Sequence, residues 1–357
     1  MGSKCTVTIN GQEIRASVGE TLVDSGLGGR VLIPHDCCSG QCDSCRVTVV
    51  SGRVDDMGTR LGDTVLACQA TLDGDAEIRF DEVPPPTRMT GRIVAMEPLS
   101  PEIVSVEIAL PRPLTYLPGQ YVSAKFLGFP YRDYSPSPGF NGTLDERRLI
   151  LHIKILPGGV VSGELGRSIR VGHKVTVRGP HGHAFWRSPQ PAQRTVLTST
   201  GTGWAPIWAI ARQACLRGEQ EGMSIVVGAR DGANIYMRPC FDWLHKHGVR
   251  DIVVVNSRNV VPPAIRGRPT DHLPEFGPGV TVYAAGAPAF VNAVQSRALA
   301  SGAICHADPF LPSVTSVSFG DRVSRWIMSG RQSRADRTGW NTGAGFRQWT
   351  RAPDARS

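Results

Sequence analysis

Four cysteines near the amino terminus constrain this chain more than any other feature. They stand in the order C-x4-C-x2-C with a fourth further along, as Cys37, Cys42, Cys45 and Cys68. Thiolates with this spacing hold plant-type [2Fe–2S] clusters, because three ligands on a tight loop and one from elsewhere surround both irons. Zinc is the alternative, but structural zinc usually takes paired C-x2-4-C hooks, and only Cys42 and Cys45 form one. The spacing therefore predicts an iron–sulfur cluster.

The remaining cysteines and the hydrophobic pattern indicate in which cellular compartment the protein is located. Of nine cysteines in the chain, those outside the cluster motif are odd in number and scattered. This distribution favours free thiols in a reducing compartment. The sequence has no apolar run of the roughly 18 residues that a transmembrane helix needs. We therefore predict a cytoplasmic protein that makes no membrane contact.

Charge is distributed unevenly along the chain. Residues 1–83 carry 7 basic and 13 acidic side chains, a net of −6, whereas residues 84–314 carry 24 and 15, a net of +9. One interpretation is solubility. The other is electrostatic docking, between the modules or with a redox partner. The basic residues form no clustered stripe with interleaved aromatic residues, so nucleic-acid binding is not expected.

The first module, residues 1–83, has the alternation of apolar and polar residues that is typical of short strands. An Asn10-Gly11 pair marks a hairpin turn, and residues 20–25 read as a short helix. The pattern predicts strands at 5–9, 13–16, 46–50, 64–67 and 76–80. A small β-rich fold wrapped on one helix follows, and Pro84-Pro85-Pro86 forms a stiff boundary behind it.

Two further modules and a tail follow. Residues 87–190 are dense in short strands separated by Gly and Pro, which predicts an antiparallel barrel. Residues 191–314 alternate apolar strands with helical stretches, which predicts a parallel sheet with crossover helices. Residues 315–357 are rich in Arg, Ser, Gly and Asp and lack periodicity. We expect these last residues to be a disordered tail, with a docking tail as the alternative.

The barrel module carries a second group of motifs. An R-x-Y-S sequence, a His-Ile-Lys sequence and a Gly-Gly-x-x-Ser run follow one another there. A guanidinium binds a phosphate through paired contacts, and a Tyr ring packs on a flavin face. The Gly-Gly-x-x-Ser run leads into a predicted helix, whose amino end suits a pyrophosphate. Together the motifs predict a flavin dinucleotide site at Arg132, Tyr134, Ser135, His152, Lys154, Gly159, Val160 and Ser162.

A glycine-rich turn follows the first strand of the α/β module and opens a helix. Its glycines permit close approach of the backbone to a phosphate. The turn is not G-x-G-x-x-G, and a tight strand-to-helix turn is the alternative reading. A later strand ends in Ala285-Gly286-Ala287-Pro288, at the carboxyl edge where such sheets bind ligands. The predicted nucleotide-binding residues are Thr200, Gly201, Thr202, Gly203, Pro206, Gly286 and Pro288.

Taken in order, these motifs resemble a known family. From residue 1 to about 313 the chain is similar to the reductase components of bacterial aromatic-ring-hydroxylating dioxygenases, of the naphthalene dioxygenase type. The resemblance implies a β-grasp plant-type ferredoxin domain, an antiparallel β-barrel FAD domain and an α/β parallel-sheet NAD domain. It also implies that FAD, a [2Fe–2S] cluster and a nicotinamide nucleotide serve the reaction.

The resemblance further implies catalytic roles for two residues. Ser135 would donate a hydrogen bond near the reactive nitrogen of the flavin. Phe310, in the run Ala307-Asp308-Pro309-Phe310, would be the aromatic residue near the flavin. The chain also departs from the family pattern. Ala285 stands where the family usually has Cys near the nicotinamide, and Asp43 replaces a usual glycine inside the cysteine loop.

Two neighbouring residues bear on the choice of nucleotide. Arg230 and Asp231 end an apolar strand of the α/β module. An Asp at such a place accepts a hydrogen bond from the 2′-hydroxyl of an adenine ribose, which favours NADH, whereas an Arg holds the 2′-phosphate of NADPH. We predict NADH, with NADPH as the alternative.

The sequence therefore predicts a monomeric electron-transfer reductase. A hydride donor and a one-electron centre need a flavin between them, which explains why these modules share one chain. Electrons are expected to pass from NAD(P)H through FAD and the cluster to a ferredoxin or a terminal oxygenase. The alternatives are the same module serving a di-iron monooxygenase or a deoxysugar dehydratase, and a redox-sensing binding protein.

Overall fold

The computed structural model describes residues 3–35, 38–40, 45–190 and 192–311. These residues divide into two compact units, the first holding nearly all of residues 1–84 and the second almost all that follows. Among the described residues, no helix is both long enough and apolar enough to cross a membrane.

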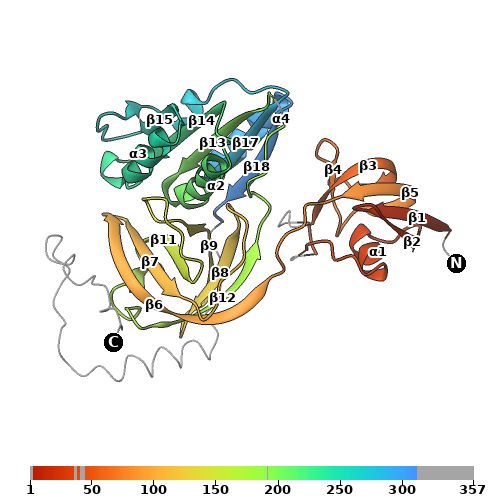
Figure 1. Cartoon of the computed structure of the whole chain (residues 1–357), viewed down its shortest axis with the longest axis horizontal. Coiled ribbons are helices and arrows are strands. Elements are labelled where there is room, and N and C mark those ends of the chain that lie inside the picture. The colour runs from red at the N-terminus through yellow and green to blue at the C-terminus, as the bar shows by residue number, and fades with distance from the viewer. Residues whose placement is uncertain (1–2, 36–37, 41–44, 191, 312–357) are drawn as a thin grey trace. The chain divides into compact units, whose positions relative to one another are not determined.

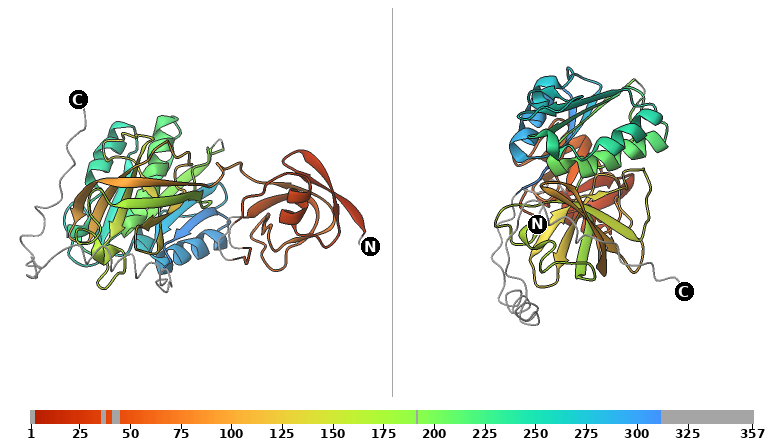
Figure 2. Two further views of the ribbon diagram at one scale, coloured as in Figure 1. Left: turned by 90° about the horizontal axis from the view of Figure 1, so that it is seen from below. Right: turned by 90° about the vertical axis from the view of Figure 1, so that its left-hand side faces the viewer.

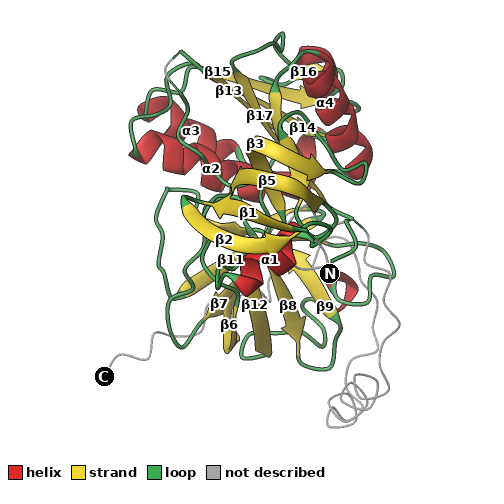
Figure 3. Ribbon diagram, turned by 90° about the vertical axis from the view of Figure 1, so that its right-hand side faces the viewer, coloured by secondary structure: helices red, strands yellow, loops and turns green. Residues whose placement is uncertain are grey.

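The first unit is a five-stranded sheet with one helix against it (Figure 3). Its strands are β1 (Lys4–Ile9), β2 (Gln12–Ser17), β3 (Arg46–Asp55), β4 (Thr64–Leu66) and β5 (Thr71–Arg79), in the order β2-β1-β5-β3-β4. Helix α1 (Leu22–Gly28) begins at Thr21, whose hydroxyl accepts a hydrogen bond from the Asp24 N–H group. The parallel pair β1–β5 forms the centre of the sheet. The resulting mixed sheet with one packed helix is the β-grasp arrangement that the resemblance implies.

The second unit begins with an antiparallel barrel. Its strands are β6 (Thr87–Ser100), β7 (Ile103–Ala109), β8 (Tyr121–Phe126), β9 (Tyr131–Tyr134), β10 (Pro136–Ser137), β11 (Arg148–Lys154) and β12 (Lys174–His181). The sheet order is β10-β11-β7-β6-β12-β8-β9. Because β9 and β10 are neighbours in the chain yet lie at opposite ends of this order, the sheet closes on itself. Alternate residues of the strands, such as Val106, Ile108 and Leu151, fill the interior.

The rest of the second unit is a six-stranded parallel sheet between helices. Its strands are β13 (Arg194–Thr200), β14 (Met223–Ala229), β15 (Asp251–Asn256), β16 (Ile265–Arg266), β17 (Val280–Gly286) and β18 (Ile304–Pro309), in the order β16-β15-β14-β13-β17-β18. Helices α2 (Trp204–Leu216) and α3 (Arg238–Lys246) cover one face, and α4 (Pro288–Ala300) covers the other (Figures 1 and 2). The strand order reverses between β13 and β17, which is the point where such sheets bind ligands.

The barrel and the parallel sheet are joined by specific hydrogen bonds. The indole N–H of Trp208 in α2 lies 3.3 Å from the carbonyl oxygens of Pro138 and Gly139, in the loop after β10. The Ser100 hydroxyl at the end of β6 donates to the Asn234 side chain at 2.9 Å. These bonds fix the barrel motifs relative to the carboxyl edge of the sheet.

The structure differs from the sequence predictions in two kinds of element. The predicted helix after the Gly-Gly-x-x-Ser run is a 3-10 helix of three residues, Ser162–Glu164. Strands β10, β16 and β18 were not predicted. Strands β10 and β16 have two residues each, and β18 is a half-exposed edge strand with the polar sequence Ile-Cys-His-Ala-Asp-Pro. Edge strands lack the continuous apolar run that marks a buried strand.

Two glycines in the first unit give a matched test of its sheet. Gly52 and Gly58 both have positive φ, but a Cβ atom on Gly52 would lie 2.2 Å from the Asp75 carbonyl oxygen, whereas Gly58 has open space. We expect Gly58→Ala to lower the free energy of unfolding of this unit by about 1–2 kcal/mol, the cost of the left-handed conformation. Gly52→Ala adds the backbone clash, for a total of about 2–5 kcal/mol.

Calorimetry of the full-length variants measures this difference through the unfolding transition of the first unit. Equal losses for the two alanine variants would contradict the close β3–β5 contact at Gly52.

Candidate functional site

Two of the four cluster cysteines lie in the described part of the chain. Cys45 precedes β3 and is 2% exposed, and Cys68 follows β4. The Cys68 N–H group points at the Cys45 sulfur at 3.4 Å. Cys37, Cys42 and Asp43 lie outside the described residues. The pair is therefore brought together by the β3–β4 hairpin, with a backbone donor aimed at one sulfur.

Gln69 places a second donor beside these cysteines. Its side-chain N–H group lies 3.0 Å from the Cys38 carbonyl oxygen and 3.7 Å from the Cys68 sulfur. Donors near thiolate sulfurs stabilise their negative charge and tune an attached metal centre. A thiolate pair with N–H donors fits an iron–sulfur cluster. Gln69 was not among the predicted site residues. In the sequence, its position directly after Cys68 is the feature that could have indicated its place beside the cluster cysteines.

The R-x-Y-S motif occupies the end of the closing strand of the barrel. In β9, Arg132 pairs with Ala124 and Tyr134 pairs with Val122, so both side chains lie on the side of the strand that these core residues share. The Arg132 guanidinium donates to the Tyr131 carbonyl oxygen at 2.7 Å. Tyr134 packs against the barrel core, and this burial raises the pKa of its hydroxyl well above the ordinary value.

Ser135 connects the barrel with the parallel sheet. It is 5% exposed, and its hydroxyl donates to Asp308 Oδ2 at 3.5 Å. Asp308 lies in β18 opposite Ala285 of β17. Burial raises the pKa of Asp308 to about 7, although the hydrogen bond from Ser135 opposes the shift. The segment between β9 and β10 and the edge strand β18 thus bring a barrel hydroxyl and a buried carboxyl group together.

Phe310 lies at the same edge. Its N–H group donates to the Gly286 carbonyl oxygen at 2.8 Å, and its ring is half-buried. Phe310, Asp308 and Ser135 therefore form one group beside the carboxyl ends of β17 and β18. Asp308 was not among the predicted site residues. Its signal in the sequence was an ionisable residue two positions before the expected aromatic residue.

The Gly-Gly-x-x-Ser run forms a tight loop after β11. Gly159 has no room for a side chain, because a Cβ atom there would lie 2.4 Å from the Ser162 hydroxyl oxygen. That hydroxyl accepts a hydrogen bond from the Leu156 N–H group at 3.1 Å, and Val160 is half-buried between them. Gly158 has positive φ and faces open space. The helix expected after this loop has only one turn. A phosphate bound here would therefore contact the backbone N–H groups of the loop.

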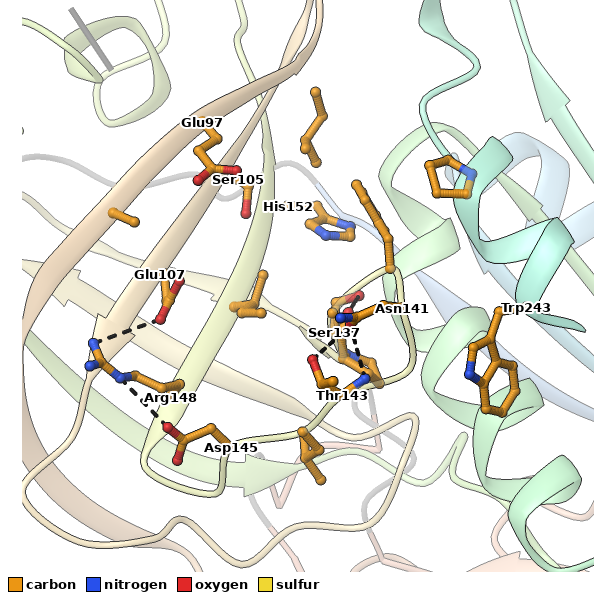
Figure 4. A pocket seen from close by; sticks show the side chains of 18 of the residues that line it. Glu97, Ser105, Glu107, Ser137, Asn141, Thr143, Asp145, Arg148, His152 and Trp243 are labelled. Carbon is orange, nitrogen blue, oxygen red and sulfur yellow. Dashed lines mark hydrogen bonds and ion pairs between the residues drawn. The ribbon is translucent and has the colours of Figure 1, made fainter. Parts of the chain in front are cut away.

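His152 lies elsewhere, in a pocket of about 1100 Å³ between the barrel and α3 (Figure 4). Its Nδ1 atom is 3.3 Å from the Tyr236 hydroxyl, and its ring contacts Phe140. Burial lowers the pKa of His152 to about 3, so the ring is neutral. Charged residues of both signs line the pocket, among them Glu97, Glu107, Asp145, Asp242, Arg148 and Lys246. The residues of the R-x-Y-S motif do not line it.

Lys154 follows His152 on β11 and points outward. Its ammonium group forms an ion pair with Glu102 at 3.0 Å, and both side chains are exposed. The structure therefore joins Ser135 to the sheet edge, whereas Arg132 and Tyr134 contact the barrel. His152 and Lys154 make other contacts.

The glycine-rich turn packs directly on the neighbouring strand. Residues Gly201–Gly203 form a 3-10 turn between β13 and α2. A Cβ atom on Gly203 would lie 2.2 Å from the Ala285 carbonyl oxygen, so only glycine fits. Gly201 has φ +56° and open space around it, and Thr202 is half-buried beside it. The backbone at Gly201 is therefore not covered by neighbouring side chains, as close approach of a nucleotide phosphate requires.

The end of β17 completes this edge. Gly286 has φ +124°, and a Cβ atom there would lie 2.5 Å from the Thr200 carbonyl oxygen. The Thr200 hydroxyl accepts a hydrogen bond from the Ala287 N–H group at 3.1 Å. Pro288 is the first residue of α4, whereas Pro206 is buried in the first turn of α2. These residues bring the two predicted nucleotide motifs together where the strand order reverses.

Arg230 and Asp231 lie further along the same edge, after β14. The Asp231 carboxylate accepts hydrogen bonds from the Ala233 N–H group at 3.0 Å and from Asn259 at 2.6 Å. These bonds lower the pKa of Asp231. The Arg230 side chain is exposed.

Comparison with known protein families finds a match in three parts of the chain. Residues 7–73 match the 2Fe-2S iron-sulfur cluster binding domain, residues 90–186 the oxidoreductase FAD-binding domain and residues 197–296 the oxidoreductase NAD-binding domain. The first match covers the cysteine motif, the second the R-x-Y-S motif, and the third the glycine-rich turn.

Relatives match over most of the chain. The ferredoxin–NAD(P)+ reductase component of the naphthalene 1,2-dioxygenase/salicylate 5-hydroxylase systems of Ralstonia sp. is 30% identical over 84% of this chain and 96% of its own length. The reductase subunit of the aromatic O-demethylase of Amycolatopsis sp. is 31% identical over 80% of this chain and 92% of its own.

A solved structure agrees with the fold. The Amycolatopsis cytochrome P450 reductase GcoB is 28% identical, with a TM-score of 0.62 over 86% of this chain and 99% of its own. With its cluster, flavin and nucleotide domains in this order, the chain is an NAD(P)H-dependent oxidoreductase. It belongs to the family of ferredoxin–NAD(P)+ reductase components that join a 2Fe-2S domain to FAD- and NAD-binding domains.

Proposed function

We propose that this reductase supplies electrons to a ferredoxin or an oxygenase component of a system that oxidises aromatic compounds. The observation that carries the proposal is the junction of the barrel and the sheet, where Ser135 meets Asp308 beside Gly286. A flavin held by the R-x-Y-S motif and a nicotinamide held at the glycine-rich turn would both lie at this junction. The names of the relatives support the aromatic system as the acceptor.

Each group of residues has a task in this proposal. When bound, the flavin accepts two electrons from the nicotinamide and passes them singly to the cluster. Arg132 would hold a flavin phosphate, Tyr134 would contact the flavin ring system, and Phe310 would supply an aromatic contact to the flavin. Thr200, Gly201 and Gly286 hold the nicotinamide nucleotide. The cysteines at positions 37, 42, 45 and 68 hold the iron–sulfur cluster.

The visible spectrum tests the electron route. We expect the purified protein to show flavin bands together with broad iron–sulfur absorbance, and we expect both to bleach when NADH or NADPH is added without oxygen. Iron and flavin assays on the same sample give the stoichiometry. A protein that holds flavin but no iron would contradict the cluster assignment and would be a simple flavin reductase.

A substitution tests the role of Ser135. If its hydroxyl donates to the flavin's reactive nitrogen, Ser135→Ala should slow flavin reduction in stopped flow by about tenfold, the upper value of one hydrogen bond. Ser137→Ala is the matched control, because the Ser137 hydroxyl is also buried but donates to the Pro138 carbonyl oxygen. An unchanged rate in Ser135→Ala would remove Ser135 from the mechanism.

The Ser135–Asp308 pair predicts a pH dependence. With a pKa of about 7, Asp308 is mostly neutral at pH 6 and mostly ionised at pH 8. An ionised carboxylate only accepts hydrogen bonds, so the Ser135 hydroxyl donates its proton to Asp308 at high pH. The neutral acid can instead donate to the Ser135 oxygen, and the Ser135 hydroxyl is then free to donate to the flavin. Flavin reduction should therefore slow by about twofold to tenfold as the pH rises through 7.

Asp308→Asn provides the comparison for this profile. Asn cannot ionise and keeps a donor, so we expect stopped-flow rates that stay flat between pH 6 and pH 8, near the low-pH rate of the unmodified protein. If the variant retained the slope of the unmodified protein, the pH dependence would belong to another group.

A further inference from the structure

Three neighbouring parallel strands each carry an arginine at their carboxyl end. Arg230 directly follows β14, Arg258 stands two residues after β15, and Arg266 is the last residue of β16. In the sheet, Ala229 pairs with Asn256, which pairs with Arg266, so the three strands end at the same level. All three arginine side chains are exposed. They therefore converge on the edge where open parallel sheets bind their ligands.

Within residues 192–311, which the structure describes, none of these guanidinium groups makes a hydrogen bond or an ion pair at contact distance. The contacts of this region instead use their backbones: the Arg258 N–H group donates to the Arg230 carbonyl oxygen at 2.9 Å, and the Arg266 carbonyl oxygen lies 3.2 Å from the His272 ring. Three exposed cations at one edge of a sheet attract a multiply charged anion, to which guanidinium groups make charge-assisted hydrogen bonds.

The carboxylates near this edge are already engaged. Asp231 accepts from Ala233 and Asn259, one bond to each oxygen. Asp271 accepts from the Arg268 N–H group at 3.2 Å and from the Thr270 hydroxyl. The Arg268 side chain is itself exposed, which adds a fourth positive charge nearby. The charge of Arg258 also contributes to the lowered pKa of Asp231. Four basic side chains therefore accompany two carboxylates at this edge, which leaves an excess of positive charge.

The position along the sheet fits the far end of a dinucleotide. The nicotinamide half is expected between β13 and β17, at Gly201 and Gly286. Strands lie about 4.8 Å apart, so β15 and β16 end about 10–14 Å from β13. An extended dinucleotide that starts at the glycine-rich turn and runs along the edge reaches these strands with its adenosine half.

We propose that Arg230, Arg258 and Arg266 bind the 2′-phosphate of NADPH, so that this chain uses NADPH in preference to NADH. The proposal rests on the proposed function, since it names the nucleotide used at the same site. It reverses the choice of NADH that Asp231 suggested in the sequence. An arginine is suited to this task, because its planar guanidinium group makes paired contacts with phosphate oxygens.

Steady-state reduction of cytochrome c by the full-length holoprotein tests the preference. We expect a higher kcat/KM with NADPH than with NADH. Arg258→Gln and Arg266→Gln should each lower kcat/KM for NADPH by about tenfold, the loss of one charge-assisted contact, and change the value for NADH by less than about threefold. Arg250→Gln is the matched control, because Arg250 is exposed at the amino end of β15.

A binding measurement that does not depend on turnover accompanies the kinetics. We expect calorimetry to show that adenosine 2′,5′-bisphosphate binds more tightly than 5′-AMP. Arg258→Gln should remove most of this difference, whereas Arg250→Gln should keep it.

The outcomes separate this inference from the proposed function. Rapid reduction with NADH but not with NADPH would overturn the phosphate site and leave the reductase assignment intact. Equal losses for both nucleotides in Arg258→Gln would also overturn it. If neither nucleotide bleached the flavin, the proposed function itself would fail.

Discussion

The close packing of the glycine-rich turn on the end of β17 is the constraint on which the rest of the catalytic unit depends. Gly203 lies so near the Ala285 carbonyl oxygen that no side chain fits, and a Cβ atom on Gly286 would lie 2.5 Å from the Thr200 carbonyl oxygen. These contacts hold β13 and β17 together at the point where the strand order reverses. They also orient the following residues, because Phe310 bonds to the Gly286 carbonyl oxygen. A shift at this point would move the nucleotide turn and the flavin-facing strand together.

The half-exposed edge strand β18 connects this point with the barrel. It places Asp308 opposite Ala285 and under the Ser135 hydroxyl. Ala285 is 1% exposed and carries no polar group. The polar chemistry at this junction is therefore supplied by Ser135 and Asp308, from the barrel on one side and from the neighbouring strand on the other.

Sequence reasoning located the motifs but not all of the contacts that they make. The glycine-rich turn and the R-x-Y-S motif could be recognised in the sequence. In each, the residues that shape the backbone and the residues that carry the chemistry stand next to one another in the chain. Asp308 and Gln69 were not identified, because their roles depend on partners that are far away in the chain or in another strand. The cofactor-binding role of His152 stays a prediction, and the contacts of its ring within the protein are with Tyr236 and Phe140. Short or edge strands such as β16 and β18 were missed because they lack a buried apolar run.

The structure also changes the interpretation of the charge. Residues 84–314 carry a net charge of +9, which the sequence left open between solubility and docking of a protein partner. Part of this excess is concentrated, since Arg230, Arg258, Arg266 and Arg268 all lie at the carboxyl edge of the sheet. Positive charge at that edge acts on a small anion within a few ångströms, where screening by salt is weak. A protein partner would instead require charge spread over a broad surface. The arginines after β14, β15 and β16 are thus better explained by the nucleotide than by docking.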